Sequence, residues 1–162
     1  MENFSVRVSK DDLAFSAAHF ITLGPDQCEG LHGHNYGLTA EVHGPLDENG
    51  YLVDFIALHK SLRAIVDELD HRVLLPLEHS AIRVVEGENE VEVRFAERRW
   101  IFPKSECCLL PLSNTTAELL ARYVGRRLLD ALPPQIAQRL SLVRIEIEES
   151  AGLCAVCELK NE

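Results

Sequence analysis

Cys28-Glu29-Gly30-Leu31-His32-Gly33-His34 is the stretch around which the sequence is organised. In a strand, side chains at positions i and i+2 point to the same face, so His32 and His34 would lie side by side, with Gly33 leaving the gap between them uncrowded. His19 lies shortly upstream, and the intervening loop would bring it to the pair. Three neutral imidazoles with one open position are typical of a catalytic zinc site. The stretch therefore predicts a metal-dependent enzyme.

Cys28 lies four residues before the first histidine of the pair, close enough to take part in the chemistry. A nearby zinc ion or protonated histidine would lower the pKa of its thiol and suit it to act as a base or nucleophile. The alternative is that Cys28 is a fourth zinc ligand, which would close the site and make it structural. The spacing leaves both roles open.

Length and composition are those of one globular domain or one subunit of an assembly. The chain has 162 residues, of which 46% are hydrophobic, and a net charge of -10 without a basic cluster. This balance disfavours nucleic acid or an anionic membrane as the main partner. We expect no signal peptide or membrane span, because charges mix with apolar residues from the start. Five cysteines, an odd number, then indicate reduced thiols in the cytoplasm.

Hydrophobic periodicity predicts an α+β fold, with an antiparallel sheet and helices layered on one of its faces. Strands are expected over residues 4–10, 13–19, 32–43 and 143–149, and in a strand-rich segment over 82–102. Helices are expected after an N-cap at Asp54 and after a capping box formed by Thr115 and Glu118. Residues 20–31 are expected to form a loop and 72–79 a connection.

Two acidic positions stand out from this pattern. Glu149 falls on the apolar face of the last strand, where a carboxylate needs a partner or a role. Asp70 precedes His71 at the end of the first helix, and a carboxylate can orient an imidazole for proton transfer. Neighbouring side chains on a helix do not face each other, so this pair requires a non-helical turn. The alternative for Asp70 and His71 is a solvated pair at a helix end.

Several motifs occur in an order that closely resembles the 6-pyruvoyl-tetrahydropterin synthase / 6-carboxy-tetrahydropterin synthase family. They are Phe15-Ser-Ala-Ala-His19, Cys28-x3-His32-Gly-His34-Asn-Tyr, Val53-Asp-Phe55, Leu69-Asp-His71, Asn114-Thr-Thr-Ala-Glu118 and Glu149-Ser150. The resemblance covers nearly the whole chain except about residues 78–112. It implies a single tunnelling-fold (T-fold) domain over residues 1–162, with 78–112 as an insertion. It also implies an antiparallel sheet with two helices on one face, and subunits joined into trimers that stack into a homohexamer.

The resemblance assigns a role to each site residue. It implies zinc on His19, His32 and His34, with Cys28 as the general base. Asp70 and His71 would form a companion proton relay. Glu149 would anchor the pterin ring, and Thr116 and Glu118 would line the pterin pocket, although capping alone is a sufficient explanation of Glu118.

The resemblance further implies a lyase that acts on 7,8-dihydroneopterin triphosphate, a small-molecule pterin. The spacing Cys-x3-His-Gly-His is that of the enzymes that form 6-carboxy-5,6,7,8-tetrahydropterin for 7-deazaguanine (queuosine) synthesis. The alternatives are 6-pyruvoyl-tetrahydropterin formation and a paralogue that cleaves another reduced pterin. The long segment 78–112, Thr115 in place of a frequent proline, and a last strand without its usual tyrosine keep the paralogue open. An alternative of another class is a non-catalytic pterin- or zinc-binding protein.

Overall fold

The structure, a computed structural model, describes residues 2–160. Along these residues the main sheet is built from β1 (Phe4–Val8), β2 (Ala14–His19), β5 (His32–Gly44), β6 (Arg72–Pro76), β10 (Cys107–Leu110), β11 (Leu142–Ser150) and β12 (Leu153–Lys160). The remaining strands are β3 (Thr22–Gly24), β4 (Gln27–Cys28), β7 (Arg83–Glu86), β8 (Glu90–Phe95) and β9 (Arg98–Pro103). The helices are α1 (Phe55–Leu69), α2 (Ala117–Ala131), α3 (Pro134–Ala137) and a 3-10 turn (Lys104–Glu106).

Strand β5 is the centre of the main sheet. It pairs with β1 and β2 along one edge and with β11 along the other, and all three pairs are antiparallel. The sheet order is β10-β6-β2-β5-β11-β12. Strand β6 pairs parallel with both β2 and β10, because it leaves the end of α1 alongside β2 in the same direction. The α+β prediction is confirmed, and these two parallel pairs make the sheet mixed rather than purely antiparallel.

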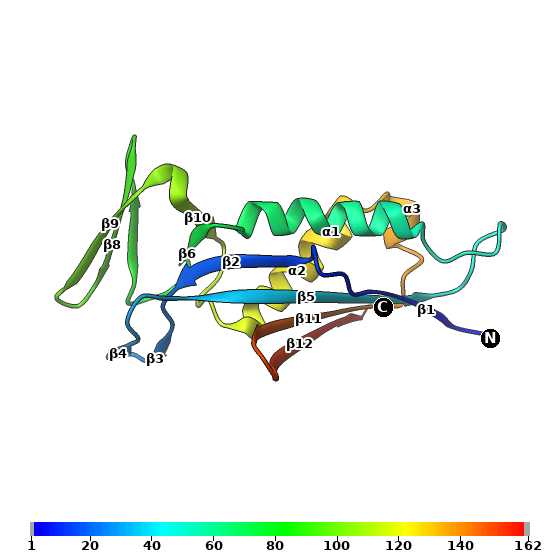
Figure 1. Cartoon of the computed structure of the whole chain (residues 1–162), viewed down its shortest axis with the longest axis horizontal. Helices are drawn as coiled ribbons and strands as arrows, with labels where there is room; N and C mark the ends of the chain where they lie inside the picture. The colour runs from blue at the N-terminus through cyan, green and yellow to red at the C-terminus, as the bar shows by residue number, and fades with distance from the viewer. Residues whose placement is uncertain (1, 161–162) are drawn as a thin grey trace.

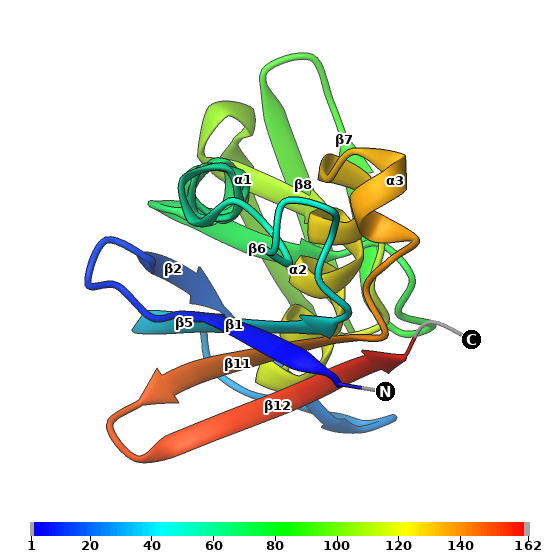
Figure 2. The same ribbon diagram turned by 90° about the vertical axis from the view of Figure 1, so that its right-hand side faces the viewer.

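Helices α1 and α2 cover one face of the main sheet (Figure 2). Helix α1 begins after Asp54, as predicted, and the Asp54 carboxylate accepts hydrogen bonds from the N–H groups of Ile56 and Ala57. Arg127 of α2 donates to both carboxylate oxygens of Glu68 on α1 at 2.7 Å. Buried side chains of the helices and of the inner sheet face form the main core.

The start of α2 corrects the predicted capping box by one residue. Thr116, not Thr115, is the N-cap, and its hydroxyl accepts from the N–H of Leu119. Thr115 is fully buried instead, and its hydroxyl donates to the carbonyl of Phe20. The capping rule was sound, but tertiary contacts of Thr115 moved the helix start.

A small sheet, β7–β9, stands at the end of the molecule away from the N-terminus (Figure 1). It confirms the predicted strand-rich segment. Its inner face closes a second, small core beside the main sheet, made of Phe20, Leu75, Ile82, Val91, Val93 and Phe95. The small sheet therefore packs on residues that come directly after β2 and within β6.

Two predicted irregular stretches contain strands. Residues 72–76 form β6 rather than a connection, because their backbone pairs with β2 and β10 while Leu74 is buried in the main core and Leu75 in the small core. Residues 22–28 hold the β3–β4 hairpin rather than only a loop. This hairpin joins the end of β2 to the start of β5, and Figure 1 shows it below the small sheet.

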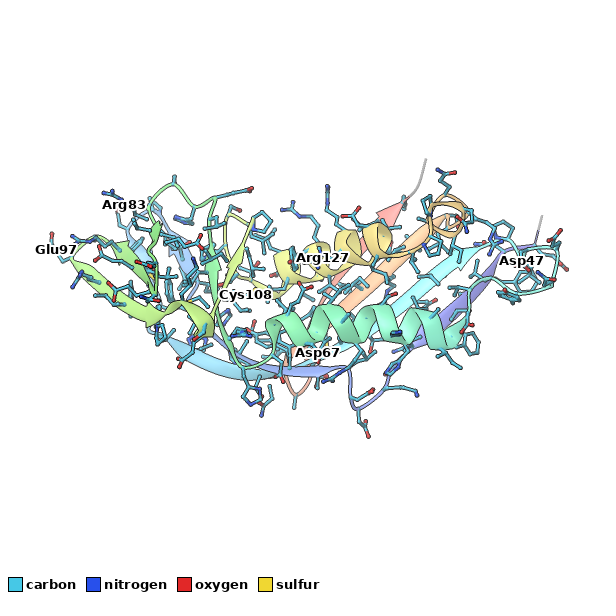
Figure 3. All side chains as sticks on the ribbon, turned by 90° about the horizontal axis from the view of Figure 1, so that it is seen from above. Asp47, Asp67, Arg83, Glu97, Cys108 and Arg127 are labelled. Atoms are coloured by element: carbon cyan, nitrogen blue, oxygen red, sulfur yellow. The ribbon has the colours of Figure 1, made fainter. Side chains whose placement is uncertain are left out.

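The molecule is elongated, with Asp47 near one end and Glu97 near the other (Figure 3). Within residues 2–160, no helix is both long enough and apolar enough to span a membrane.

Candidate metal centre

Three histidines converge at the end of the main sheet next to the small core. His19 ends β2, and His32 and His34 open β5 directly beside it. Their ligand-type nitrogens lie within 4.8 Å of one another. The ring centroids are 4.8 Å apart for His19 and His32, 5.3 Å for His19 and His34, and 4.8 Å for His32 and His34. The predicted convergence is present.

Main-chain carbonyls fix the tautomer of two of these rings. The Nδ1–H of His19 donates to the carbonyl of Thr115 at 2.9 Å, and that of His32 donates to the carbonyl of Gly30 at 2.8 Å. A carbonyl only accepts, so each ring carries its proton on Nδ1 and leaves Nε2 unprotonated, and for His19 this Nε2 faces the Tyr36 hydroxyl at 3.3 Å. Burial lowers the pKa of His19 against the opposing effect of its Thr115 hydrogen bond. Neutral rings with a free Nε2 are what metal binding requires.

His34 supplies the observation that tests the fit to a metal. Its Nε2 is buried and has no hydrogen-bond partner within the described part of the chain. Glu149 Oε1 lies 3.2 Å away, but the two groups are not aligned for a hydrogen bond. An unpaired buried nitrogen costs free energy unless something binds it. The three histidines therefore fit a divalent ion with an imidazole preference, such as zinc.

Gly33 was predicted to leave the gap between the His32 and His34 rings uncrowded, but the structure gives it a different role. It points to the opposite face of the sheet from His32 and His34, so it does not lie between their rings. A Cβ at Gly33 would meet the carbonyl oxygen of Ala17 at 3.2 Å. Glycine therefore allows β2 and β5 to approach closely next to the histidines.

Cys28 lies on β4, outside the histidine cluster. Its thiol is partly buried against the small core and lies 3.5 Å from the carbonyl of Glu29. Burial raises the pKa of this thiol, and the positive charge of Arg98 opposes that rise. The absence of the Cys28 sulfur from the cluster argues against a fourth ligand, and the role of Cys28 as a base stays a prediction.

Asp70 and His71 form the non-helical turn that their cooperation required. Asp70 has extended backbone and His71 has φ of 56°, and Asp70 Oδ2 lies 3.0 Å from His71 Nδ1. The backbone N–H of Ser16 donates to the other oxygen of Asp70 at 2.8 Å, and this bond, followed by His71, lowers the Asp70 pKa. The predicted carboxylate–imidazole pair is present.

No hydrogen bond or ion pair joins this pair to the histidine cluster within residues 2–160. The His71 ring is 81% exposed and lines a hollow of about 420 Å³ together with Ser16, Ala18 and Asn35, and His34 of the cluster also borders this hollow. Ser16 and Ala18 alternate with the buried residues of β2, so this hollow lies on the face of the sheet without helices. His19 lies on the other face. Sequence reasoning could not resolve this separation, because it depends on which face the turn after α1 reaches.

The three predicted pterin-binding residues lie together. Glu149, Thr116 and Glu118 line a hollow of about 440 Å³ beside β12. The alternation of β11 predicted the direction of Glu149 correctly, and the carboxylate reaches the histidine cluster despite a register shift between Glu148 and Ser150. A carboxylate next to a metal site and a hollow is suited to bind a ligand with N–H groups.

Sequence reasoning missed two further side chains at the cluster. The Tyr36 hydroxyl lies 3.3 Å from His19 Nε2, and Glu29 Oε2 lies 3.8 Å from His32 Nε2. Burial raises the pKa of the Tyr36 phenol, which keeps it neutral. Tyr36 could have been found by extending the i, i+2 alternation by one step. For Glu29 the sequence carried no such signal.

The fold and the site define a tunnelling-fold protein with three histidines arranged as for a metal ion. The model of the 6-pyruvoyl tetrahydropterin synthase family matches residues 7–160, and the chain belongs to that family.

Relatives and solved structures agree with this membership. A Methanocaldococcus jannaschii protein provisionally named 6-carboxy-5,6,7,8-tetrahydropterin synthase is 29% identical over 141 residues, with 86% of each chain covered. A dihydroneopterin monophosphate aldolase of Pyrococcus furiosus is 41% identical over 61 residues, 38% of this chain and 51% of that one. The fold matches the 6-pyruvoyl tetrahydropterin synthase of Plasmodium vivax with a TM-score of 0.91, at 23% identity and 99% coverage of both chains.

Proposed function

We propose that the chain is a zinc-dependent pterin lyase that converts 7,8-dihydroneopterin triphosphate to 6-carboxy-5,6,7,8-tetrahydropterin. The observation that carries this proposal is the buried Nε2 of His34, which forms no hydrogen bond within residues 2–160 and lies next to two rings with unprotonated Nε2 atoms and to the Glu149 hollow. The provisional name of the M. jannaschii relative supports the carboxy product.

Each group of site residues has its own role in the proposed reaction. His19, His32 and His34 would hold zinc, which supplies Lewis acidity to side-chain oxygens of the substrate when bound. Glu149 accepts hydrogen bonds from N–H groups of the pterin ring, while Thr116 and Glu118 line its hollow. Cys28 removes a proton from the substrate side chain, and the triphosphate leaves by elimination. Cleavage of the C6 side chain with uptake of water then releases the other two carbons as acetaldehyde and leaves the carboxyl group on C6.

We infer that the Asp70–His71 pair acts at the metal site of a second copy of the chain. The His71 ring is exposed on the face without helices, whereas the three histidines lie on the helix face. Strand β12 has a free edge, as expected of a subunit that pairs with a neighbour. We therefore propose a homo-oligomer, a trimer or hexamer, in which His71 of one subunit serves the metal site of another.

The product assay tests the proposal. Incubation of the zinc-loaded protein with 7,8-dihydroneopterin triphosphate should yield 6-carboxy-5,6,7,8-tetrahydropterin by mass spectrometry. Cys28→Ala should abolish turnover while zinc and pterin stay bound, and Cys157→Ala is the matched control that should retain turnover. Loss of zinc in Cys28→Ala would make Cys28 a ligand and refute the mechanism. Bound zinc and pterin without turnover in the unaltered protein would favour a binding protein instead.

A second candidate is cleavage of another dihydroneopterin side chain. The similarity to the P. furiosus dihydroneopterin monophosphate aldolase favours it. The same assay with dihydroneopterin monophosphate decides between the two, because the products differ in mass. Aldol cleavage leaves a hydroxymethyl group on C6, whereas the carboxy-forming reaction leaves a carboxyl group and the pyruvoyl-forming reaction a three-carbon chain.

All five cysteines are unpaired, in agreement with a reducing compartment. We therefore place the reaction in the cytoplasm.

A further inference from the structure

Arg98 of β9 connects the small sheet to the segment that carries Cys28. Its Nη1 donates to the carbonyl oxygens of Cys28 and Glu29, at 2.9 Å each. The guanidinium lies 4.6 Å over the Trp100 ring, which stacks on Phe20 with centroids 4.7 Å apart. Phe20 follows His19 directly, so one chain of contacts reaches both sides of the β3–β4 hairpin.

The neighbours of Arg98 show that this placement is specific. Arg94 and Arg99 lie on the exposed face of the small sheet, and both pair with Glu92. Arg98 points the other way and forms no ion pair with a carboxylate anywhere in residues 2–160. Its positive charge is met by two carbonyl dipoles and an indole face instead. A surface arginine needs no such environment.

The two carbonyls belong to residues that are otherwise held by few contacts. The N–H of Glu29 donates to the carbonyl of Ile21 at 3.0 Å, which closes the hairpin at its base. Beyond Glu29 the chain enters β5 at His32, and the His32 Nδ1–H donates to the carbonyl of Gly30. Arg98 therefore braces the segment between the hairpin base and the second histidine.

We propose that Arg98 is a positioning residue that holds the main chain of Cys28 and Glu29, and with it the Cys28 thiol, in place for proton transfer. Through Arg98, the segment of residues 78–112 contributes to the reaction. The expected effect of Arg98 on turnover rests on the proposed function. The charge of Arg98 also opposes the rise that burial causes in the pKa of Cys28. The same side chain thus orders the thiol and favours its reactive form.

The test compares Arg98→Met with Arg99→Met. Methionine keeps an unbranched apolar chain for the Trp100 face but removes both hydrogen bonds. Amide hydrogen exchange of residues 27–31 should quicken on the order of tenfold in Arg98→Met relative to β11 as internal reference, and should not change in Arg99→Met. The kcat should fall by about ten- to a hundredfold with KM within about twofold, because the Glu149 hollow is untouched.

Rescue separates positioning from general stability. Arg98→Lys keeps the charge and a shorter donor, so its exchange and kcat should lie between those of the unaltered protein and Arg98→Met. If Arg98→Met does not fold, Arg98→Lys tests the same proposal, with smaller expected changes in hydrogen exchange and in kcat. Unchanged exchange at 27–31, or faster exchange with unchanged kcat, would overturn the proposal. If the unaltered protein turns over no pterin, the proposed function fails, and the exchange measurement alone decides whether Arg98 holds this segment.

Discussion

The main core and the small core differ in what they contribute to the site. The main core packs two helices on a seven-stranded sheet, and its strands β2 and β5 carry the three histidines. The small core packs a three-stranded sheet on Phe20 and the β3–β4 hairpin, which carries Cys28. The metal ligands thus lie on strands of the main sheet at its border with the small core, where Phe20 directly follows His19, and the Cys28 thiol packs against the small core. Under the proposed function, one site is therefore assembled from two packing units.

Truncating one side chain in each core gives the largest expected effect. Phe20→Ala and Leu62→Ala both remove fully buried side chains, and each should lower the free energy of unfolding by about 3–4 kcal/mol in denaturant titration. Only Phe20→Ala should also weaken zinc binding, by at least about tenfold in a chelator competition, because Phe20 follows His19. Equal losses of zinc affinity in both variants would contradict the division between the cores.

Asn114 connects the residues around His19 to the start of the β3–β4 hairpin, so its replacement tests the contact between the two packing units. Its side chain binds the backbone of Thr22 and accepts from the N–H of Thr115, whose carbonyl orients His19. Asn114→Ala should cost about 1–3 kcal/mol of stability and reduce zinc affinity by roughly tenfold. The exposed turn residue Asn49 is the control, and Asn49→Ala should leave zinc affinity unchanged. Unaltered zinc affinity in Asn114→Ala would show that Thr115 holds its position without this clamp.

Asp70 lies on the main unit, away from both cores, and should show a smaller, pH-dependent effect. The Ser16 N–H and then His71 lower its pKa in the folded state. A lowered carboxyl pKa contributes stability above the unfolded value near 3.8, and this stability is lost as the pH falls through the folded value. Asp70→Asn should therefore lose less stability than the unaltered protein between about pH 4 and pH 2, by less than about 1 kcal/mol in acid titration. Identical acid profiles would contradict the assignment.

The smallest effect is expected at the β8–β9 turn, at the far edge of the small sheet. Ala96 has φ of 50°, where a Cβ is strained and glycine is not. Ala96→Gly should raise the free energy of unfolding by about 0.5 kcal/mol, since relief of strain exceeds the added chain entropy. Zinc affinity should stay the same. A destabilised variant would show that the turn carries no strain.

Sequence periodicity predicted the main unit well, because its strands and helices bury one face each. The alternation of β5 placed His32 and His34 on one face, and that of β11 directed Glu149 to the histidines. The strands of the small sheet were also predicted, but not their docking. The contacts of Arg98 with Cys28 and Glu29 join residues about 70 positions apart, and no local pattern encodes such a pairing.

Gly33 lacks a Cβ, and this allows the close separation of β2 and β5 next to the three histidines. Because a Cβ there would lie 3.2 Å from the Ala17 carbonyl oxygen, a larger residue requires a shift of a few tenths of an ångström between the two strands. His19 lies on β2 and His32 lies on β5. The spacing of the histidines, and with it the size of ion that they fit, thus depends on a residue on the opposite face of the sheet.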